Sequence, residues 1–312
     1  RGRRHNMNGV ICIDKPSGMT SFDVVAIVRS LTNERKVGHA GTLDPMATGV
    51  LPIFLGGATK AIPLLLNHDK RYTAGLRLGI KTDTGDITGK VLATSEVFAT
   101  PEQVEAAVLS FKGNIKQIPP MYSALKSGGR HLYAIAREGG YVERKPRDIT
   151  IYDIGVTGRD ESSGDYLIDV YCSKGTYIRT LCEDIGDKLG CGGTMSSLRR
   201  TYAAGFDLTS CITLDEAERL AEEDKLDTVI LNVEELFKEL PEIHITKNQA
   251  VRFRNGGALS FDRLHGAPQS GLCRVKYADI FLGLGESNKE KRQINVKCHF
   301  NREIPLNSGE VI

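Results

Sequence analysis

The sequence lacks the features of a membrane, secreted or metal-binding protein. No apolar run among its 312 residues is long enough to cross a bilayer, and nothing resembles a secretory signal peptide. The seven cysteines are scattered, odd in number and without a C-x-x-C pair that would indicate a zinc site or a redox couple. Such cysteines are typical of reduced thiols in the cytosol, so we expect a cytoplasmic protein with no bound metal.

Two common nucleotide-binding patterns are also absent. The chain contains no G-x-G-x-x-G sequence and no P-loop, and its expected strands and helices do not alternate regularly enough for a Rossmann-type sheet. It shows neither internal repeats nor low-complexity tracts. Residues 1–6 precede Met7 and are expected to be a remnant of expression, so the fold prediction starts at Met7. The length that remains is enough for two domains.

The charge is unevenly distributed. A net charge of +2 conceals an acidic segment, residues 213–239, with ten Asp or Glu against three Lys or Arg. The rest of the chain therefore carries about nine positive charges in excess. A basic body is compatible with a polyanionic partner, although solvated surface charge is the commoner explanation, and charge alone does not decide between them.

Capping patterns and periodicity predict four helices. Three begin after Thr20, Thr100 and Thr213, because each of these threonines is followed three residues later by an acid or a glutamine. The fourth is indicated by apolar residues at helical spacing within 178–189, ahead of Gly190. We expect the acidic segment, which starts at Thr213, to be helical until near residue 240.

Period-two alternation predicts half-buried antiparallel strands at residues 72–78 and 166–172. Helices and strands together indicate the α+β class. Beyond Leu240 and Pro241 the sequence pattern changes to strand-like runs, which are typical of a small β-rich domain. We therefore predict one domain over residues 7–240 and a second over 241–312.

The stretch "GHAGTLDPMATGVL", residues 38–51, places Asp44 among small residues and directly before a proline. Asp followed by Pro commonly begins a turn, so a structural role is one interpretation. Glycines at 38, 41 and 49 allow a close approach by other groups that a side chain would block. The same loop could therefore present Asp44 to a ligand.

Five segments, in order, resemble the TruB-type tRNA pseudouridine synthases, which isomerise a uridine in the T loop. These segments cover most of the chain between residues 9 and 205: 9–25, 36–52, 70–89, 117–139 and 173–186. The resemblance implies a catalytic domain with a mixed, mainly antiparallel sheet flanked by helices, a basic RNA-binding insertion at about 117–147, and a PUA-like RNA-binding domain at the C-terminus. It implies a reaction that needs no cofactor.

Three catalytic residues follow from this resemblance. The family's nucleophilic aspartate falls on Asp44, and the arginine that pairs with it falls on Arg179. Tyr72 matches the tyrosine that stacks on the target base and has been assigned a part in proton transfer at C5. Without the family, Arg179 would be interpreted as a surface residue on a helix and Tyr72 as a core residue on a strand.

The resemblance also assigns residues that bind the substrate. His39 matches a histidine that enters the RNA fold, Tyr177 lines the pocket, and Leu198 is an apolar residue facing the site. Without the family, His39 would be interpreted as a loop residue and Leu198 as a core residue. Lys15, with Pro16, matches a motif that we expect to support the site structurally.

The predicted insertion is rich in cations that can contact phosphates. Its six basic residues are Lys126, Arg130, Arg137, Arg144, Lys145 and Arg147. Contacts of this kind position an RNA without reading its sequence and weaken as salt rises. We expect the partner to be the T-arm stem-loop of tRNA, modified at position 55 by a monomer that needs no other protein.

Three alternative functions remain open from the sequence. An RNA-folding factor would bind the tRNA elbow without needing Asp44, Tyr72 and Arg179 together. A guide-RNA-dependent relative like dyskerin would share the catalytic motifs and require a guide. An aspartate-dependent glycosidase or phosphatase would need further carboxylates; "TDTGD" is the only candidate cluster, and we interpret Asp83 and Asp86 as turn and strand-end residues.

Overall fold

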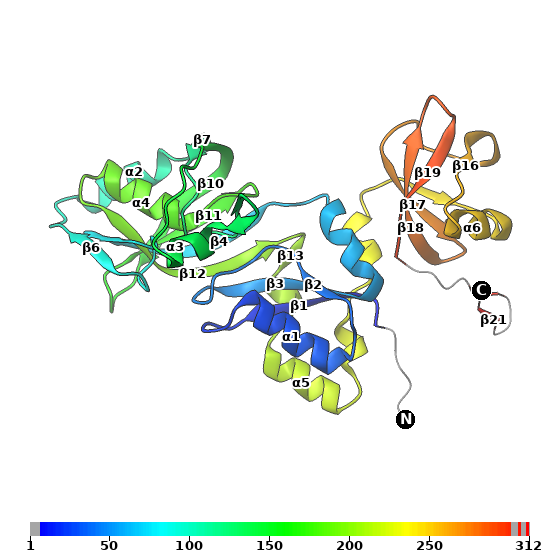
Figure 1. The fold of residues 1–312 in the computed structure, drawn as a ribbon, viewed down its shortest axis with the longest axis horizontal. Helices are drawn as coiled ribbons and strands as arrows, with labels where there is room; N and C mark the ends of the chain where they lie inside the picture. The colour runs from blue at the N-terminus through cyan, green and yellow to red at the C-terminus, as the bar shows by residue number, and fades with distance from the viewer. Residues whose placement is uncertain (1–6, 301–304, 307–309, 312) are drawn as a thin grey trace.

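The computed structural model describes residues 7–300, 305–306 and 310–311. The expected expression remnant, residues 1–6, lies outside the described residues. Figure 1 shows an elongated arrangement in which a large sheet forms the body and a smaller C-terminal sheet stands at one end. No helix in the described part of the chain is long and apolar enough to cross a membrane.

A mixed sheet of ten strands forms the body. Its main order is β14-β1-β3-β12-β4-β11-β10-β7, with β2 paired to β3 and β13 paired to β12. Two pairs, β1 with β14 and β3 with β12, are parallel, and the others are antiparallel. The mixed, mainly antiparallel sheet of the prediction is confirmed. The strands are β1 (Gly9–Lys15), β2 (Val37–His39), β3 (Thr48–Leu55), β4 (Lys70–Leu78), β7 (Gly113–Gln117), β10 (Arg147–Arg159), β11 (Tyr166–Cys172), β12 (Gly193–Ala203), β13 (Phe206–Asp207) and β14 (Cys211–Ile212).

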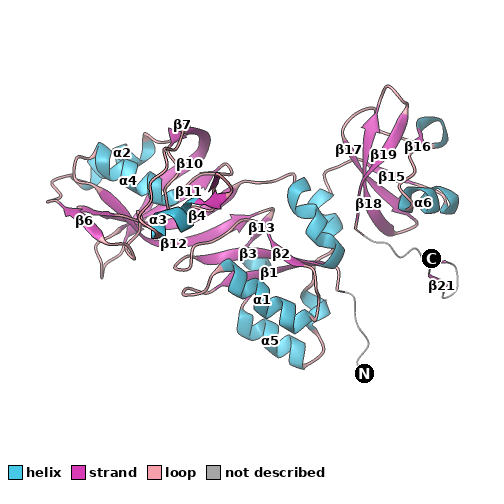
Figure 2. Ribbon diagram, viewed as in Figure 1, coloured by secondary structure: helices cyan, strands magenta, loops and turns pink. Residues whose placement is uncertain are grey.

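Four helices cover this sheet in two pairs, as Figure 2 shows. They are α1 (Ser21–Thr32), α2 (Pro101–Leu109), α4 (Ile178–Lys188) and α5 (Leu214–Glu222). All four predicted helices are present, and Thr20, Thr100 and Thr213 cap three of them through their hydroxyl oxygens. Helix α1 contacts α5, α2 contacts α4, and their apolar faces join the sheet in one core.

The helical expectation for the acidic segment is wrong beyond residue 222. Helix α5 ends there, and two 3-10 helices follow, Leu226–Val229 and Val233–Phe237. Asp224 adopts a left-handed conformation with φ 56°, which an α-helix cannot continue through. Leu226, Val233 and Phe237 are buried, so packing against the body takes precedence over helix propensity here.

A second, five-stranded sheet forms the small β-rich domain near the C-terminus, in the order β15-β17-β18-β19-β16. It has its own apolar core and one capped helix. Its Phe300 ring stacks on Phe237 and Phe281 at 5.7 and 5.6 Å between centroids, which fastens this sheet to the body. The elements are β15 (Glu242–His244), α6 (Lys247–Arg254), β16 (Leu259–Ser260), β17 (Leu272–Tyr277), β18 (Ile280–Asn288) and β19 (Gln293–His299), followed by β20 (Pro305–Leu306) and β21 (Glu310–Val311).

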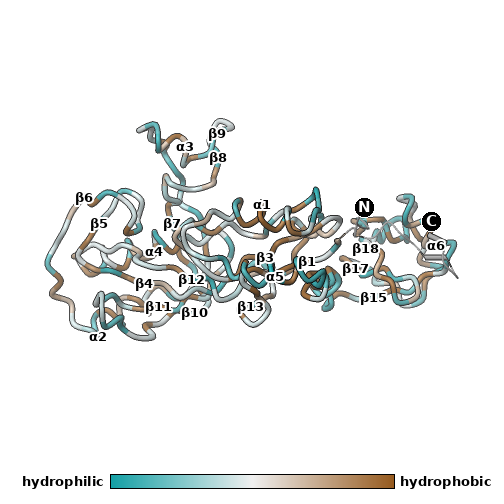
Figure 3. The backbone as a smooth tube through the Cα atoms, turned by 90° about the horizontal axis from the view of Figure 1, so that it is seen from below, coloured by the Kyte–Doolittle hydropathy of each residue, from teal (hydrophilic) through white to brown (hydrophobic). Residues whose placement is uncertain are grey.

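A short arm projects from the body, as Figure 3 shows from below. It contains β8 (Lys126–Ser127), β9 (Arg130–His131) and α3 (Leu132–Arg137). A separate hairpin is made of β5 (Ile80–Thr82) and β6 (Val91–Thr94), and a long 3-10 helix covers Gly56–Leu64. The arm lies within residues 117–147, the range of the predicted basic insertion.

Candidate active site

Asp44 lies in the loop between β2 and β3, and this loop is fixed from several sides. Ser21, the first residue of α1, accepts a hydrogen bond from the Leu43 amide at 2.9 Å and donates one to the Leu43 carbonyl at 3.1 Å. The Asp44 carbonyl accepts the Ala47 amide at 3.0 Å, so the Asp-Pro sequence does begin a turn. The turn leaves the Asp44 side chain 38% exposed. The loop therefore combines a turn with a partly exposed carboxylate, and its part in binding a ligand stays a prediction.

Arg179 is the cation that faces this carboxylate. Its Nε lies 3.2 Å from Asp44 Oδ2, and its side chain is only 8% exposed. The other two nitrogens donate to backbone carbonyls, Nη1 to Thr84 at 3.0 Å and Nη2 to Tyr122 at 2.7 Å. Since Tyr122 lies at the base of the arm, three distant segments meet on one guanidinium. The fork geometry of arginine suits this task.

Asp86 is a second acid beside Arg179, and its interpretation as a turn or strand-end residue is incomplete. It is only 5% exposed, and its Oδ2 lies 3.8 Å from Arg179 Nη1. Its other oxygen accepts hydrogen bonds from Thr84 and Thr88, which is the turn that the sequence suggests. No local pattern signals the proximity to Arg179, because it depends on how the 82–89 loop folds onto α4. Asp83 only accepts the Lys90 amide at 2.7 Å, as expected of a turn residue.

The environment raises the pKa of Asp44. Burial is the main cause, the Arg179 charge opposes it, and the Asp86 charge adds to it. A carboxylate that is more basic than usual yet partly exposed is suited to act as a nucleophile or a base. The described residues hold no cluster of His, Cys, Asp and Glu that could bind a metal ion.

The strand pair β4–β12 forms the floor beneath this loop. Tyr72 pairs in register with Arg200, and Ala74 pairs with Leu198. Tyr72 and Leu198 are 7% and 9% exposed, and alternation places them on one face of the sheet. Burial raises the pKa of the Tyr72 phenol to about 12, although the Arg200 charge opposes this shift. Tyr72 is therefore a neutral ring at physiological pH.

Arg200 is a residue that the sequence reasoning missed. It is fully buried, and it donates from Nε to Val50 O at 2.8 Å and from Nη2 to Gly41 O at 2.9 Å. It thus joins both ends of the Asp44 loop. A side chain at Gly49 would stand 2.1 Å from the Arg200 carbonyl, so this crossing requires glycine. The period-two position of Arg200 after Leu198 is the signal that could have revealed it.

Lys15 lies under the same loop rather than in the open site. It is fully buried, and its ammonium donates to Pro16 O at 2.8 Å, Met19 O at 2.5 Å and Pro45 O at 3.2 Å. Burial lowers the pKa of Lys15 to about 8. The contact with Pro45 fixes the residue next to Asp44, in keeping with structural support.

His39 and Tyr177 flank the site. His39 ends β2, and its ring meets the edge of Phe22 at 5.5 Å, while Phe22 itself is 73% exposed. Burial lowers the pKa of His39, so its ring is neutral near pH 7. Tyr177 caps α4 and is held by Gln117, whose side-chain oxygen accepts the Tyr177 amide at 3.0 Å. The exposed Phe22 ring and the half-buried His39 ring thus stand together on one side of the Asp44 loop.

The arm carries its basic residues in the open. Lys126, Arg130 and Arg137 are all exposed. Arg130 forms an ion pair with Glu138 at 2.5 Å, and Arg137 lies over the Tyr133 ring at 5.7 Å. These cations are available to a ligand that approaches the arm, although Arg130 must share its charge with Glu138.

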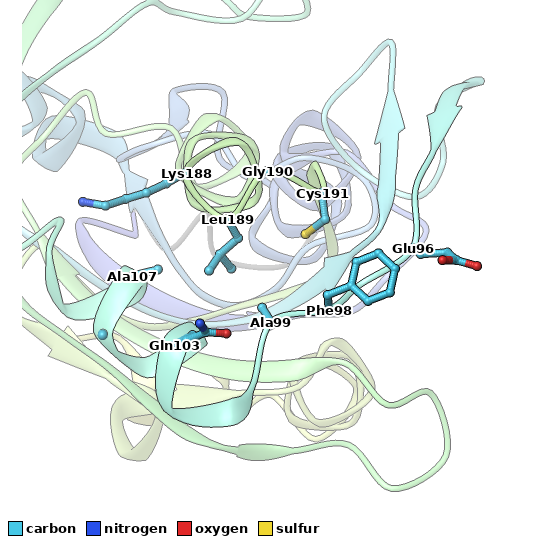
Figure 4. Close-up of a pocket in the computed structure, with 10 residues that line it drawn as sticks. Glu96, Phe98, Ala99, Gln103, Ala107, Lys188, Leu189, Gly190 and Cys191 are labelled. Carbon is cyan, nitrogen blue, oxygen red and sulfur yellow. The ribbon is translucent and has the colours of Figure 1, made fainter.

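A shallow cavity of about 580 Å³ lies away from these residues, between α2 and the C-terminal end of α4. Figure 4 shows its lining, in which Leu189 points from the end of α4 toward α2, the helix that carries Gln103 and Ala107. Arg179 belongs to the other end of α4, so this cavity is separate from the Asp44 site.

Glu183 provides a test of the electrostatics next to Arg179. Burial, reinforced by Asp184, raises the pKa of Glu183 from its ordinary 4.5 to about 7. The folded state therefore binds this proton more tightly than the unfolded state, so the cost in stability is absent below pH 4.5 and complete above pH 7. We expect Glu183→Gln to raise the free energy of unfolding by on the order of 1 kcal/mol at pH 8, after allowance for solvent screening.

Thermal unfolding at pH 8 and pH 4.5 measures this effect. A gain of about 2–4 °C in Tm is expected at pH 8 and none at pH 4.5. The control is Glu223→Gln, since hydrogen bonding to Lys225 lowers the pKa of the exposed Glu223 and its loss should bring no gain. An equal gain for Glu183→Gln at both pH values would contradict the assignment.

Three family models match the chain in succession. The TruB family pseudouridylate synthase N-terminal domain matches residues 29–178, and the tRNA pseudouridylate synthase B C-terminal domain matches residues 179–238. A third model, the pseudouridine synthase II TruB C-terminal domain, matches residues 241–293.

Curated relatives and solved structures agree with these models. The tRNA pseudouridine synthase B of Alkaliphilus oremlandii is 43% identical over 296 residues, which cover 93% of this chain and 97% of the relative. The protein of the same name from Clostridium tetani is 44% identical over 91% of this chain and 97% of its own length. A chain of the archaeal box H/ACA sRNP Nop10-Cbf5 complex has a TM-score of 0.69 at 26% identity, with 96% and 88% of the two chains covered. The chain therefore belongs to the TruB family of pseudouridine synthases, enzymes that isomerise uridine to pseudouridine.

Proposed function

We propose that this protein converts the uridine at position 55, in the T loop of tRNA, to pseudouridine, with Asp44 as the nucleophile. The observation that carries the proposal is the contact of 3.2 Å between Asp44 and Arg179 in a fixed loop. Relatives with this chain's architecture are named tRNA pseudouridine synthase B, which supports tRNA as the substrate.

The chemistry needs little beyond a placed carboxylate. Attack by Asp44 supplies the electron pair that displaces the base as the bond from C1′ to N1 breaks. The base then turns, and its C5 displaces the Asp44 carboxylate, so that the bond from C1′ to C5 forms as the bond from C1′ to the Asp44 oxygen breaks. C5 loses its proton to solvent, and N1 takes one up. Composition and redox state are unchanged, so the reaction needs no cofactor. Splitting one difficult displacement into two steps is the usual advantage of a covalent intermediate.

The neighbouring residues take supporting roles in this proposal. Arg179 orients Asp44 and favours its charged form, while the neutral Tyr72 ring stacks on the base above the apolar Leu198. Lys15 holds the loop from beneath through Pro45. These roles agree with the burial of Tyr72 and Lys15 and with the exposure of the Asp44 carboxylate.

A uridine inside a folded T loop reaches Asp44 only after it leaves the stack, and the enzyme must offset the free energy of unstacking. We assign His39, with the exposed Phe22 beside it, to the space that the uridine leaves, and Tyr177 to the pocket wall. Phosphate contacts fall to Lys126, Arg130 and Arg137 on the arm. In this account a monomer acts alone on tRNA in the cytoplasm.

The test is to map pseudouridine in an unmodified tRNA transcript after incubation with the purified chain. Chemical labelling followed by primer extension should show one new stop, at the T-loop uridine, and none in a transcript with cytidine at that position. Binding without product would favour a folding factor. Product that appears only when a guide RNA is added would favour a guide-dependent relative. Either result would overturn the proposal.

A further inference from the structure

A pair of cations, Lys70 and Arg200, lies beside the Asp44 loop. Lys70 and Arg200 project from β4 and β12 on the face that also carries Tyr72, because side chains alternate along each strand. Both lie against Gly41. A Cβ built on Gly41 would be 3.2 Å from Arg200 Nη1 and 3.4 Å from Lys70 Cε, so the two cations approach each other closely.

Neither cation is compensated within the described residues. Lys70 Nζ donates to the carbonyl of His68 at 2.7 Å, and Arg200, whose Nη1 is buried, meets the neutral Tyr72 phenol, which is no counter-charge. No carboxylate lies within ion-pair distance of either side chain in that part of the chain. The nearest acid in sequence, Asp69, faces the opposite way, where it accepts hydrogen bonds from the hydroxyls of Tyr152 and Tyr171.

Two like charges act on Lys70. Burial lowers the pKa of Lys70, and the charges of Arg200 and Lys174 lower it further, while Cys172 and Asp69 oppose this shift. Burial also lowers the pKa of His68, and Lys174 and Lys70 reinforce that shift. Like charges held together away from water are costly, and an anion between them removes the cost. Gly41 is exposed, so the site is open on the side of the Asp44 loop.

We propose that Lys70, with Lys174 at the rim, binds the RNA phosphodiester that flanks the target uridine, while the buried Arg200 adds its positive charge from beneath. The inference rests on the proposed function. A group bound over Gly41 lies three residues from the nucleophile, on the face of β4 that carries Tyr72. An extruded nucleotide brings its own flanking phosphates to this place. A phosphate oxygen would accept a charge-assisted hydrogen bond from Lys70.

The experiment pairs one protein variant with a scan of the RNA backbone. T-arm stem-loops that each carry one neutral methylphosphonate in the loop are bound to the wild type, to Lys70→Gln and to Lys225→Gln. Lys225 serves as the matched control, because it is ion-paired with Glu223 in the acidic segment. Dissociation constants are measured from low to moderate salt, and pseudouridine formation by the wild type is recorded separately.

We expect Lys70→Gln to reduce the slope of log K against log salt by about 0.7, the value for one phosphate of a single strand. One methylphosphonate next to the target uridine should weaken binding to the wild type and to Lys225→Gln by about 10-fold, the loss of one charge-assisted hydrogen bond. The same substitution should have little effect on Lys70→Gln. Lys70→Arg keeps the positive charge and should restore the slope of log K against log salt. A residue with only a structural role would not show this dependence on charge.

Two results would overturn the inference. One is that every methylphosphonate weakens Lys70→Gln and the wild type equally, since no single phosphate would then depend on Lys70. The other combines two observations: inorganic phosphate at constant ionic strength stabilises the wild type but not Lys70→Gln, and no methylphosphonate position has a different effect on the two proteins. The site would then bind a free anion and not the RNA backbone. Absence of pseudouridine with the wild type would instead contradict the proposed function. The binding constants of the wild type and the variants could still be compared.

Discussion

Asp44→Asn is expected to reduce the single-turnover rate of pseudouridine formation by roughly 10³-fold or more, because an amide of the same shape cannot supply the attacking electron pair. The loop should keep its conformation, since Leu43 and Ala47 bond through the backbone and Ser21. The dissociation constant for tRNA should therefore change little. Release of tritium from RNA labelled at C5 of uridine measures the rate, because C5 loses its hydrogen in the reaction.

The matched control is Asp83→Asn, the same chemical change in a turn aspartate of the neighbouring loop. Its carboxylate only accepts the Lys90 amide, so its rate should stay near that of the wild type. The role of Asp44 would be contradicted if Asp44→Asn kept a rate within tenfold of the wild type. It would also be contradicted if RNA binding were lost together with the rate.

Arg179→Gln is expected to reduce the rate by about 10²-fold, the scale of a misplaced reacting group. It removes the contact with Asp44 and the two donors that hold Thr84 and Tyr122. The Arg179 charge lowers the pKa of Asp44, so its loss should raise that pKa further. The rate should then fall, on acidification, at a higher pH than in the wild type. A pH–rate profile of the RNA-bound enzyme measures this.

Two further variants separate this effect from unfolding. Arg179→Lys keeps the charge, so it should lose rate through geometry while the acid limb of the profile stays nearer to that of the wild type. Arg199→Gln is the control. It removes the ion pair of Arg199 with Asp14 at 2.7 Å, next to Leu198 on β12, and it should leave the pH–rate profile unchanged. An unchanged acid limb in Arg179→Gln would show that Arg179 does not act on Asp44.

The elements with local signals could be predicted from the sequence. The hydroxyls of Thr20, Thr100 and Thr213 accept backbone hydrogen bonds within three residues, so the sequence itself contains each cap and its partner. The strands at 72–78 and 166–172 alternate because each has one face in the core, and both are present as β4 and β11. The predicted helix of the acidic segment was wrong beyond α5, because the burial of Phe237 depends on contacts with residues that are distant in sequence.

The site itself was only partly accessible to sequence reasoning. The resemblance predicted that Arg179 pairs with Asp44, and in the structure Arg179 Nε lies 3.2 Å from Asp44 Oδ2, while their catalytic roles stay predictions. Asp86 and Arg200 were missed because their roles depend on contacts between segments that are distant in sequence. Arg200 bonds to Gly41 and Val50, about 150 residues away. The turn pattern around Asp86 explained the presence of this residue locally, so its proximity to Arg179 was not predicted.

The most direct measurement of the central claim uses a T-arm stem-loop RNA with tritium at C5 of the target uridine alone. The purified chain is mixed in excess with this RNA in buffer that contains a metal chelator and no guide RNA or second protein. Our account predicts that nearly every bound RNA releases its tritium and gains one pseudouridine at that position. Tight binding without tritium release would contradict it, and so would release that begins only when another macromolecule is added.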